Sequence, residues 1–322
     1  RIMTAHVRIV GRIALRYIVS LWAASVIIFL IMRLIPGDPA EVSLGETATP
    51  QAIESMKHTL GTDRPLITQY FSWITGMLHG HFGVSYSSGT DIGPILMDRA
   101  AVSLILVLTS MVLAIALAVP LGTWAALRNH KPDGTALSVL AHVGIAIPSF
   151  LAGILLISLF AIHWSILPAN GWVPPNQSFT GFLRRLILPC CALAFIQAAI
   201  LTRYVRSAVL EVLHQEYIRT ARSTGLSTLH ALVAHGARNA AVPIVAVIGV
   251  NMATLVVGAV LIEQVFVIPG LGSYVLDAVN SRDMITVQSC VVMLVTITLT
   301  VTLAADAVAT LIDPRMSRSR LV

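Results

Sequence analysis

The residues with the clearest chemical pattern form a basic insert, residues 210–243, in an otherwise very apolar chain. Its central run and the polar residues after it read Tyr217-Ile218-Arg219-Thr220-Ala221-Arg222-Ser223-Thr224-Gly225-Leu226, then His235, Arg238, Asn239 and Pro243. Small residues let another body approach the backbone closely, and glycine permits a turn with positive φ. This pattern therefore predicts a surface that binds another protein.

The apolar residues of the insert predict one amphipathic helix over residues 208–223. Its apolar face would carry Val209, Val212, Leu213, Tyr217 and Ala221, with the charged residues turned largely away. An alternative is a re-entrant hairpin that lies on lipid and is attracted by anionic headgroups. That alternative explains the arginines but not the small tip, where a lipid-binding helix would carry Trp, Phe or Leu.

Histidine and serine side chains offer a different function, that of an intramembrane hydrolase. His142 and His163 fall in one apolar segment with Ser149 and Ser158. A nucleophile and its base must come within about 3 Å, whereas residues seven apart on a helix lie about 10 Å apart along its axis. Polar residues that line a bundle interior are the more ordinary explanation, so we expect no catalytic residues.

The sequence does not predict a metal site or an ATP-binding site in this chain. The three cysteines, Cys190, Cys191 and Cys290, lie in or beside apolar runs, and no histidine pair at ligand spacing accompanies them. We therefore expect buried thiols and no metal site. A P-loop needs Gly-Lys-[Ser/Thr], but Lys57 follows Met56 and Lys131 follows His130, and the chain has no other lysine. Any ATP and Mg²⁺ must bind to another subunit.

Composition places the chain in a membrane. Hydrophobic residues make up 56% and charged residues 11%, against about 25% charged in soluble domains. A helix needs about 20 apolar residues to cross the hydrocarbon core. The uncharged runs are 17–32, 100–127, 186–202, 239–262 and 284–305, and 135–163 supplies a sixth. The sequence thus predicts an all-α membrane protein with six transmembrane helices.

The distribution of positive charge predicts the orientation of these spans. Of the 21 Lys and Arg residues, 14 fall on the side that holds both termini and the insert, and seven fall on the other side. By the positive-inside rule both termini and the insert are cytoplasmic. The pI of about 9.7 is then a topology signal. No basic face interleaved with aromatic residues accompanies it, so we expect no nucleic acid partner.

The N-terminal region divides into two parts. Arg8, Arg12 and Arg16 before an apolar run resemble a signal peptide, but no small-residue cleavage site closes the run, which favours a retained first span. Residues 1–35 are therefore expected to form a tail and the first span. Residues 36–98 would form an extracytoplasmic segment, and 99–322 the core.

The extracytoplasmic segment is predicted to contain two short helices. Thr49 and Pro50 suit a helix start and Gly61 a stop, so 50–60 reads as one helix. A second is expected from Pro65 to Gly80. The segment holds seven acidic residues against one lysine and one arginine. It would either shield helix ends or receive a partner or substrate.

Prolines and polar residues within the spans suggest a pathway. Pro148 falls in the middle of the run 135–163, where it should kink the helix. Ser149, Asn251 and Thr254 are polar positions in kinked or central spans. We take these three as candidates for lining a translocation pathway.

Motifs along nearly the whole chain resemble one family. Besides the insert they include Pro36-Gly37-Asp38-Pro39-Ala40, Leu60-Gly61-Thr62-Asp63-Arg64-Pro65-Leu66, Pro148-Ser149-Phe150, Glu263 with Phe266 and Pro269-Gly270-Leu271-Gly272, Arg282-Asp283, and Asp313-Pro314-Arg315. This set resembles binding-protein-dependent ABC importer permeases, specifically the B-type subunit of the dipeptide, oligopeptide and nickel group. The insert resembles their EAA loop, except that Arg219 stands at its usually acidic first position.

The resemblance implies a type I ABC importer permease without catalytic activity, in a bacterial or archaeal plasma membrane. Its partners would be a second, similar permease, two ATP-binding subunits or a fused one, an extracytoplasmic substrate-binding protein, and membrane lipid. The cargo would be peptide, with nickel, glutathione or another small solute as the alternative. Residues 207–241 would form the coupling loop, with contacts to the ATPase at Tyr217, Arg219, Thr220, Ala221, Arg222, Gly225, Leu226, Arg238 and Asn239.

Overall fold

A computed structural model describes residues 2–34, 40, 44 and 48–312. In these ranges the chain is helical apart from loops and one isolated antiparallel bridge between Val84 and Asp91. It divides into two compact units. The first comprises residues 1–9, 104–268 and 298–322, and the second comprises 10–103 and 269–297.

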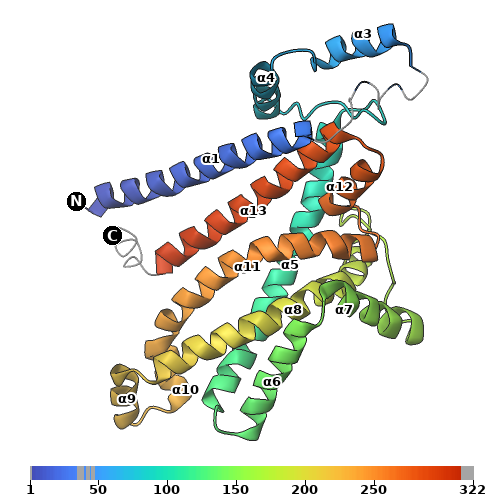
Figure 1. Cartoon of the computed structure of the whole chain (residues 1–322). Helices are drawn as coiled ribbons and strands as arrows, with labels where there is room; N and C mark the ends of the chain where they lie inside the picture. Colours follow the sequence, from blue (N-terminus) through green and yellow to red (C-terminus); the bar gives the residue numbers. More distant parts are fainter. Residues whose placement is uncertain (1, 35–39, 41–43, 45–47, 313–322) are drawn as a thin grey trace. The chain divides into compact units, whose positions relative to one another are not determined.

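Five helices are long and apolar enough to cross a membrane (Figure 1). The long helices of the chain are α1 (Ile2–Leu34), α5 (Ile92–Leu127), α8 (Phe179–Leu213), α11 (Ala237–Val265) and α13 (Met284–Ile312). The all-α membrane class is therefore confirmed. Pro120 and Pro189 lie inside α5 and α8, which continue through them, as is tolerated in membrane helices when neighbouring groups satisfy the freed carbonyls.

The run 135–163 does not form one kinked helix. It consists of α6 (Pro132–Ala146), α7 (Ser149–Leu156) and a π-helical stretch, Ile157–His163, and it bends by 100° at the break after α6. The residue before a proline is pushed out of the helical region, and Ile147 accordingly has φ −87° and ψ 120°. The described residues therefore contain five candidate spans, or six if the bent pair is one span.

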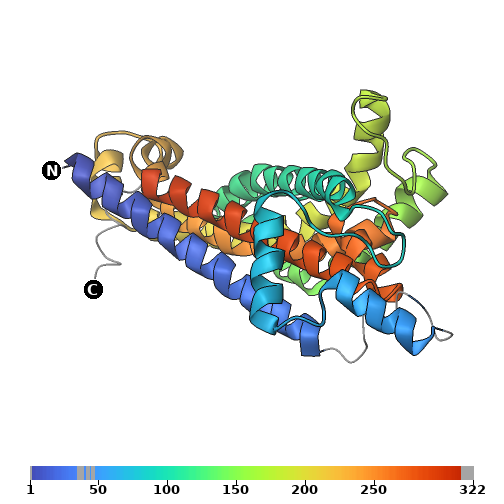
Figure 2. The same ribbon diagram turned by 90° about the horizontal axis from the view of Figure 1, so that it is seen from above.

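The two short helices of the segment 36–98 are confirmed. In α3 (Pro50–Leu60) the Thr49 side chain accepts a hydrogen bond from the Ala52 amide, and Gly61 ends the helix with φ 67°. In α4 (Leu66–Leu78) the Tyr70 hydroxyl lies 2.8 Å from Ser25 Oγ of α1. Figure 2 shows α4 lying across α1, where Tyr70 and Trp73 also pack on Phe29.

Asp283 joins two distant segments within the second unit. Its buried carboxylate accepts hydrogen bonds from Ser85 Oγ at 2.5 Å, from Thr286 Oγ1 at 2.7 Å and from the Tyr86 amide at 3.2 Å. The loop before α5 is thereby fixed to the start of α13, close to α12 (Leu271–Asn280). Burial raises the pKa of Tyr86; Arg33 opposes that shift and Asp283 adds to it.

Within the first unit α5 packs closely against α8 at Gly122. A Cβ atom built on Gly122 of α5 would lie 2.8 Å from the Thr202 carbonyl oxygen and 2.7 Å from Val205 Cβ. Small residues allow this approach in membrane helices, where association depends on van der Waals packing. The C-terminal half of α8, which leads into the insert, is therefore held against α5.

Candidate functional site

The insert folds as a short helix, a turn and a second helical segment. After α8 ends at Leu213, the chain forms α9 (Glu216–Ser223), and Gly225 makes a turn with φ 98°. It continues through α10 (Thr228–Ala231) and a π-helical turn, Leu232–Gly236, into α11. The positive φ at Gly225 is confirmed, but the prediction of one helix over 208–223 is wrong, because the helix breaks between Leu213 and Glu216.

Ile218 fixes α9 to the body of the first unit, although the apolar face predicted from the sequence did not include it. Its side chain is fully buried in a cluster with Val205, Val209, Val212 and Leu232. Because the helix breaks before Glu216, the phase of the apolar face is reset, so Ile218 rather than Tyr217 faces the core. A 38% exposed Tyr217 is left at the surface. Only a correct placement of the break could have revealed this.

Gly236 lets the two arms of the insert meet. A Cβ atom at this position would lie 2.6 Å from Val212 Cγ1 and 3.3 Å from Ile218 Cδ1. Valine is stiff at χ1, so it could not easily move aside. The insert is therefore a packed element with one buried side and one exposed side.

A neutral hollow lies on one side of α9. It has a volume of about 440 Å³ and is lined by Tyr217, Thr220, Ala221, Thr224, His235 and Asn239. The Asn239 amide donates a hydrogen bond of 2.8 Å to the Tyr217 hydroxyl, which joins the start of α11 to α9. Thr220 is exposed and its hydroxyl bonds back to the Glu216 carbonyl oxygen, whereas Ala221 packs partly against the buried cluster.

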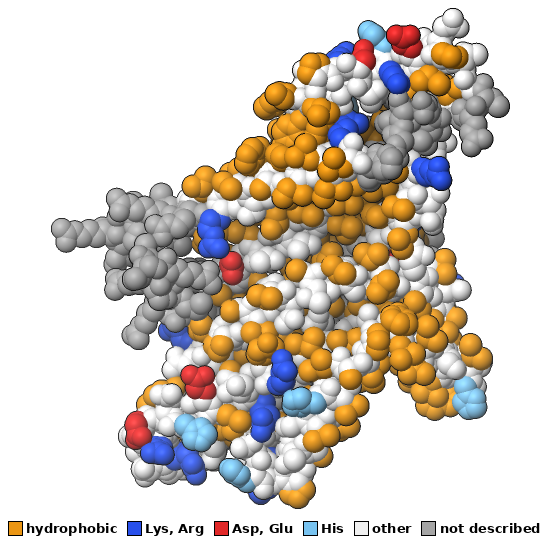
Figure 3. Space-filling model, in the orientation of Figure 1, with side chains coloured by type: hydrophobic (Ala, Val, Ile, Leu, Met, Phe, Trp, Pro, Cys, Tyr) orange, Lys and Arg blue, Asp and Glu red, His pale blue; other side chains and the backbone are white. Residues whose placement is uncertain are grey.

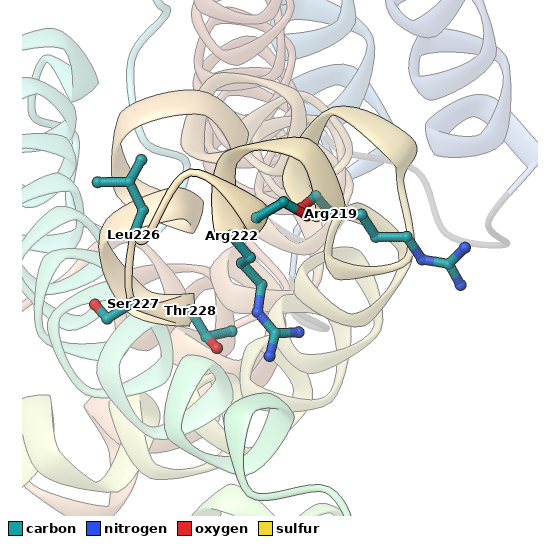
Figure 4. Close-up of a pocket in the computed structure, with 6 residues that line it drawn as sticks. Arg219, Arg222, Leu226, Ser227 and Thr228 are labelled. Carbon is teal, nitrogen blue, oxygen red and sulfur yellow. The ribbon is translucent and has the colours of Figure 1, made fainter.

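A cationic hollow lies on the other side of α9 (Figure 4). Its volume is about 470 Å³, and it is lined by Arg219, Arg222, Ser223, Leu226, Ser227 and Thr228. Arg219 pairs with Glu216 at 3.0 Å, with both side chains largely exposed. The Ser227 hydroxyl caps α10 by accepting a hydrogen bond from the His230 amide. Figure 3 shows charged and histidine side chains gathered around this part of the molecule.

The structure brings most of the predicted contact residues into these two hollows. Tyr217, Thr220, Ala221 and Asn239 line the neutral one, and Arg219, Arg222 and Leu226 line the cationic one. Gly225 forms the turn between the helices, with open space where a Cβ would lie. Arg238 lines neither hollow. The arrangement can hold protruding side chains of another protein, but its contact with an ATPase stays a prediction.

The three candidate pathway residues lie near α11. Asn251 and Thr254 belong to α11, and a Cβ atom built on Gly258, one turn further, would lie 4.0 Å from Ser149 Oγ. Gln197 of α8, which was not among the predicted pathway residues, is 3% exposed, and its side chain donates a 3.4 Å hydrogen bond to the Asn251 carbonyl oxygen. Its Oε1 atom has no hydrogen-bond partner in the described part of the chain.

His142 and Ser149, two of the residues considered for a hydrolase, do not share a helix. His142 lies in α6, with Nδ1 2.6 Å from the Ser138 carbonyl oxygen, and Ser149 begins α7 beyond the 100° bend. Cys190 and Cys290 are buried free thiols. Among residues 2–34, 40, 44 and 48–312, no group of three or more His, Cys, Asp or Glu side chains could hold a metal ion.

Comparison with known proteins identifies the family. The model described as "Binding-protein-dependent transport system inner membrane component" matches residues 118–318, and the model for the N-terminal part of such components matches residues 6–118. A probable peptide ABC transporter permease protein of Sinorhizobium fredii is 36% identical over 309 residues, which is 96% of this chain and 97% of that protein.

A second relative is the dipeptide transport system permease protein of Escherichia coli (strain K12). It is 33% identical over 317 residues, covering 91% of this chain and 93% of that protein. The matches run through the apolar helices and the insert alike. The chain therefore belongs to the family of binding-protein-dependent transport system inner membrane components, and it is a multi-pass permease subunit of an ABC importer in the plasma membrane.

Proposed function

We propose that this permease forms half of a translocation pathway for di- or oligopeptides and is driven by separate ATPase subunits through the insert. The observation that carries the proposal is the structure of the insert: Ile218 anchors α9 in the buried cluster, and two open hollows lie on the exposed sides of α9. The named peptide and dipeptide permeases among the relatives support a peptide cargo. Nickel, glutathione or another small solute in the same architecture is the alternative.

The proposed topology has six spans, with both termini and the insert in the cytoplasm. The bent pair α6 and α7 would count as one span, and the excess of 14 Lys and Arg residues over seven supports the orientation. On this view residues 1–35 form a tail and first span, 36–98 an extracytoplasmic segment, and 99–322 the core with its coupling loop 207–241.

The partners that we propose are a second permease, two ATPase subunits or a fused one, and an extracytoplasmic substrate-binding protein. The sequence lacks Gly-Lys-[Ser/Thr], which a P-loop requires, so ATP and Mg²⁺ would be bound by the partners. The acidic segment 36–98 offers a surface on which the substrate-binding protein can dock. Transport would follow from closure of the ATPases, transmitted through α9.

Thr220→Trp tests the docking role. Thr220 is exposed and lines the neutral hollow, so a bulky side chain there should block a partner without disturbing the core. We expect ATP-driven dipeptide uptake into proteoliposomes to fall roughly tenfold or more, as for truncation of a central interface residue. Thermal stability should be unchanged. Ala221 and Gly225 are less clean targets, since Ala221 packs on the buried cluster and Gly225 has a positive φ.

The matched control for this variant is Leu229→Trp, at a residue of α10 that is 50% exposed and lines neither hollow. Normal uptake and normal ATPase binding by Thr220→Trp would contradict the docking role. Competition for uptake by Ala-Ala, glutathione and Ni²⁺ in the same vesicles would separate the three cargo classes.

Asn251→Ala tests the pathway. The Gln197 side chain of α8 donates a hydrogen bond to the Asn251 carbonyl oxygen of α11, and the Asn251 side-chain amide donates to the Val247 carbonyl oxygen. Amide side chains such as Asn251 can exchange hydrogen bonds with a peptide backbone. We expect a higher KM for dipeptide uptake, by roughly threefold to tenfold for one lost hydrogen bond, with ATPase binding unchanged. Val250→Ala, at a 72% exposed position one residue away, is the control. An unchanged KM in Asn251→Ala would remove this residue from the pathway.

A further inference from the structure

The guanidinium group of Arg222 is a free cation at the edge of the cationic hollow. Within the described residues its side chain makes no hydrogen bond and no ion pair. Arg219, one turn earlier on α9, is instead paired with Glu216. In Figure 4 the Arg222 side chain runs beside Thr228, whereas Arg219 extends away from it. The two arginines therefore differ in what they offer to a partner.

The charges and hydrogen-bond donors that line the hollow suit an anion. Its six residues include two arginines and three hydroxyl side chains and no acidic residue. The Ser223 hydroxyl donates to the Arg219 carbonyl oxygen and the Ser227 hydroxyl accepts from the His230 amide, whereas Thr228 lies beside the Arg222 side chain in Figure 4. An arginine fork matches a carboxylate in a bidentate way, and the resulting hydrogen bonds are stronger than neutral ones.

The surroundings favour a protein carboxylate over a lipid headgroup. Glu216 on the same helix has a side chain that is 82% exposed, and an anionic membrane surface would repel it. Apart from Tyr217, the exposed residues of α9 are small or charged, whereas a helix that binds a membrane interface carries several bulky apolar side chains. A partner with a protruding acidic side chain fits both the open volume and the charge.

We propose that an Asp or Glu side chain of the ATPase enters this hollow and forms an ion pair with Arg222, with the Thr228 hydroxyl as a further donor. The proposal rests on the docking role of the insert proposed above and adds the chemistry of one contact.

Zero-length crosslinking tests this contact directly. A carbodiimide joins a carboxylate to an amine only where the two touch, and the chain has only Lys57 and Lys131 as lysines. In the complex of this chain with its second permease and their ATPase, Arg222→Lys should give an amide crosslink to an ATPase Asp or Glu, located by mass spectrometry. Arg219→Lys, the matched control, should give little, since Glu216 of its own chain lies beside residue 219.

Charge reversal gives a second readout. We expect Arg222→Glu to weaken ATPase binding at least about tenfold and Arg219→Gln to change it less than about threefold. Replacing the crosslinked ATPase acid with lysine should restore binding to Arg222→Glu. ATPase binding to Arg222→Gln should also depend less on salt concentration than ATPase binding to the parent protein, because an ion pair is lost.

The outcomes separate this proposal from the docking role itself. If Thr220→Trp blocks ATPase binding while Arg222→Glu binds normally and no crosslink forms, docking stands and the carboxylate contact is wrong. If neither variant affects ATPase binding, the docking role fails as well. If Arg222→Glu instead leaves ATPase binding unchanged and lowers only the amount of phosphatidylglycerol that copurifies with the permease, the hollow holds a lipid headgroup and the proposal is overturned.

Discussion

Gly122→Leu is expected to prevent assembly of a stable permease. The glycine brings α5 so close to α8 that even a Cβ atom would lie 2.8 Å from the Thr202 carbonyl oxygen. A backbone atom cannot swing aside as the end of a side chain can, so the two helices would have to separate. Overpacking of this kind costs about 1–3 kcal/mol and can cost more. We expect aggregation, or a melting temperature about 10 °C lower, by fluorescence-detected size-exclusion chromatography with heating.

Gly11→Leu is the matched control for this variant. Gly11 lies in α1, and nothing lies within 4 Å of the position where its Cβ would be. Leucine is also a better helix former than glycine, so this control should express and melt like the parent protein. A stable, monodisperse Gly122→Leu permease that still binds the ATPase would show that the approach of α5 to α8 is not required.

The helices and the motif-bearing loops were predictable because their signals are local. Long uncharged runs mark five of the helices, and Thr49 and Gly61 bound α3 as expected. The turn after the insert's first helix also contains a glycine with positive φ, as its small residues predict. These signals depend on neighbouring residues alone, so no knowledge of the tertiary packing was needed.

The errors arose where a break changes the phase of a helix. The predicted helix over 208–223 placed Tyr217 on the apolar face, but the interruption at His214 and Gln215 turns Ile218 inward instead. In the same way Ile147 leaves the helical region before Pro148, so the chain bends by 100° where only a kink was predicted. Periodicity fixes a face only within one continuous helix, and neither break carries a strong local signal of its size.

The two hollows and the buried amide of Gln197 lay beyond what the sequence could predict. Each hollow combines residues from both arms of the insert, and Gly236 lets these arms pack closely by lying against Val212. Gln197 contacts Asn251 across 54 residues of chain. Such contacts depend on how distant helices pack, whereas composition and motif spacing identified the residue types but not their neighbours.

Asp283→Ala is expected to release the loop before α5 from the start of α13. The carboxylate accepts hydrogen bonds from Ser85, Tyr86 and Thr286 and is 2% exposed. Its removal leaves several buried donors without an acceptor, and each such group costs about 1–3 kcal/mol. We expect a total loss above about 3 kcal/mol, fast hydrogen exchange at the Tyr86 amide, and chymotryptic cleavage after Tyr86 in detergent.

Two further variants show whether this effect belongs to the carboxylate. Asp277→Ala removes an exposed acid from α12 in the same unit, so it should leave exchange and cleavage unchanged. Asp283→Asn keeps one acceptor oxygen but adds two donors, so its rates of hydrogen exchange and of cleavage should lie between those of the parent protein and those of Asp283→Ala. A buried carboxylate that accepts several hydrogen bonds is stabilising only while its donors are paired. If the Tyr86 amide exchanges equally slowly in Asp283→Ala and in the parent protein, the apolar cluster of Ile92, Leu96 and Leu271 holds this loop without the carboxylate.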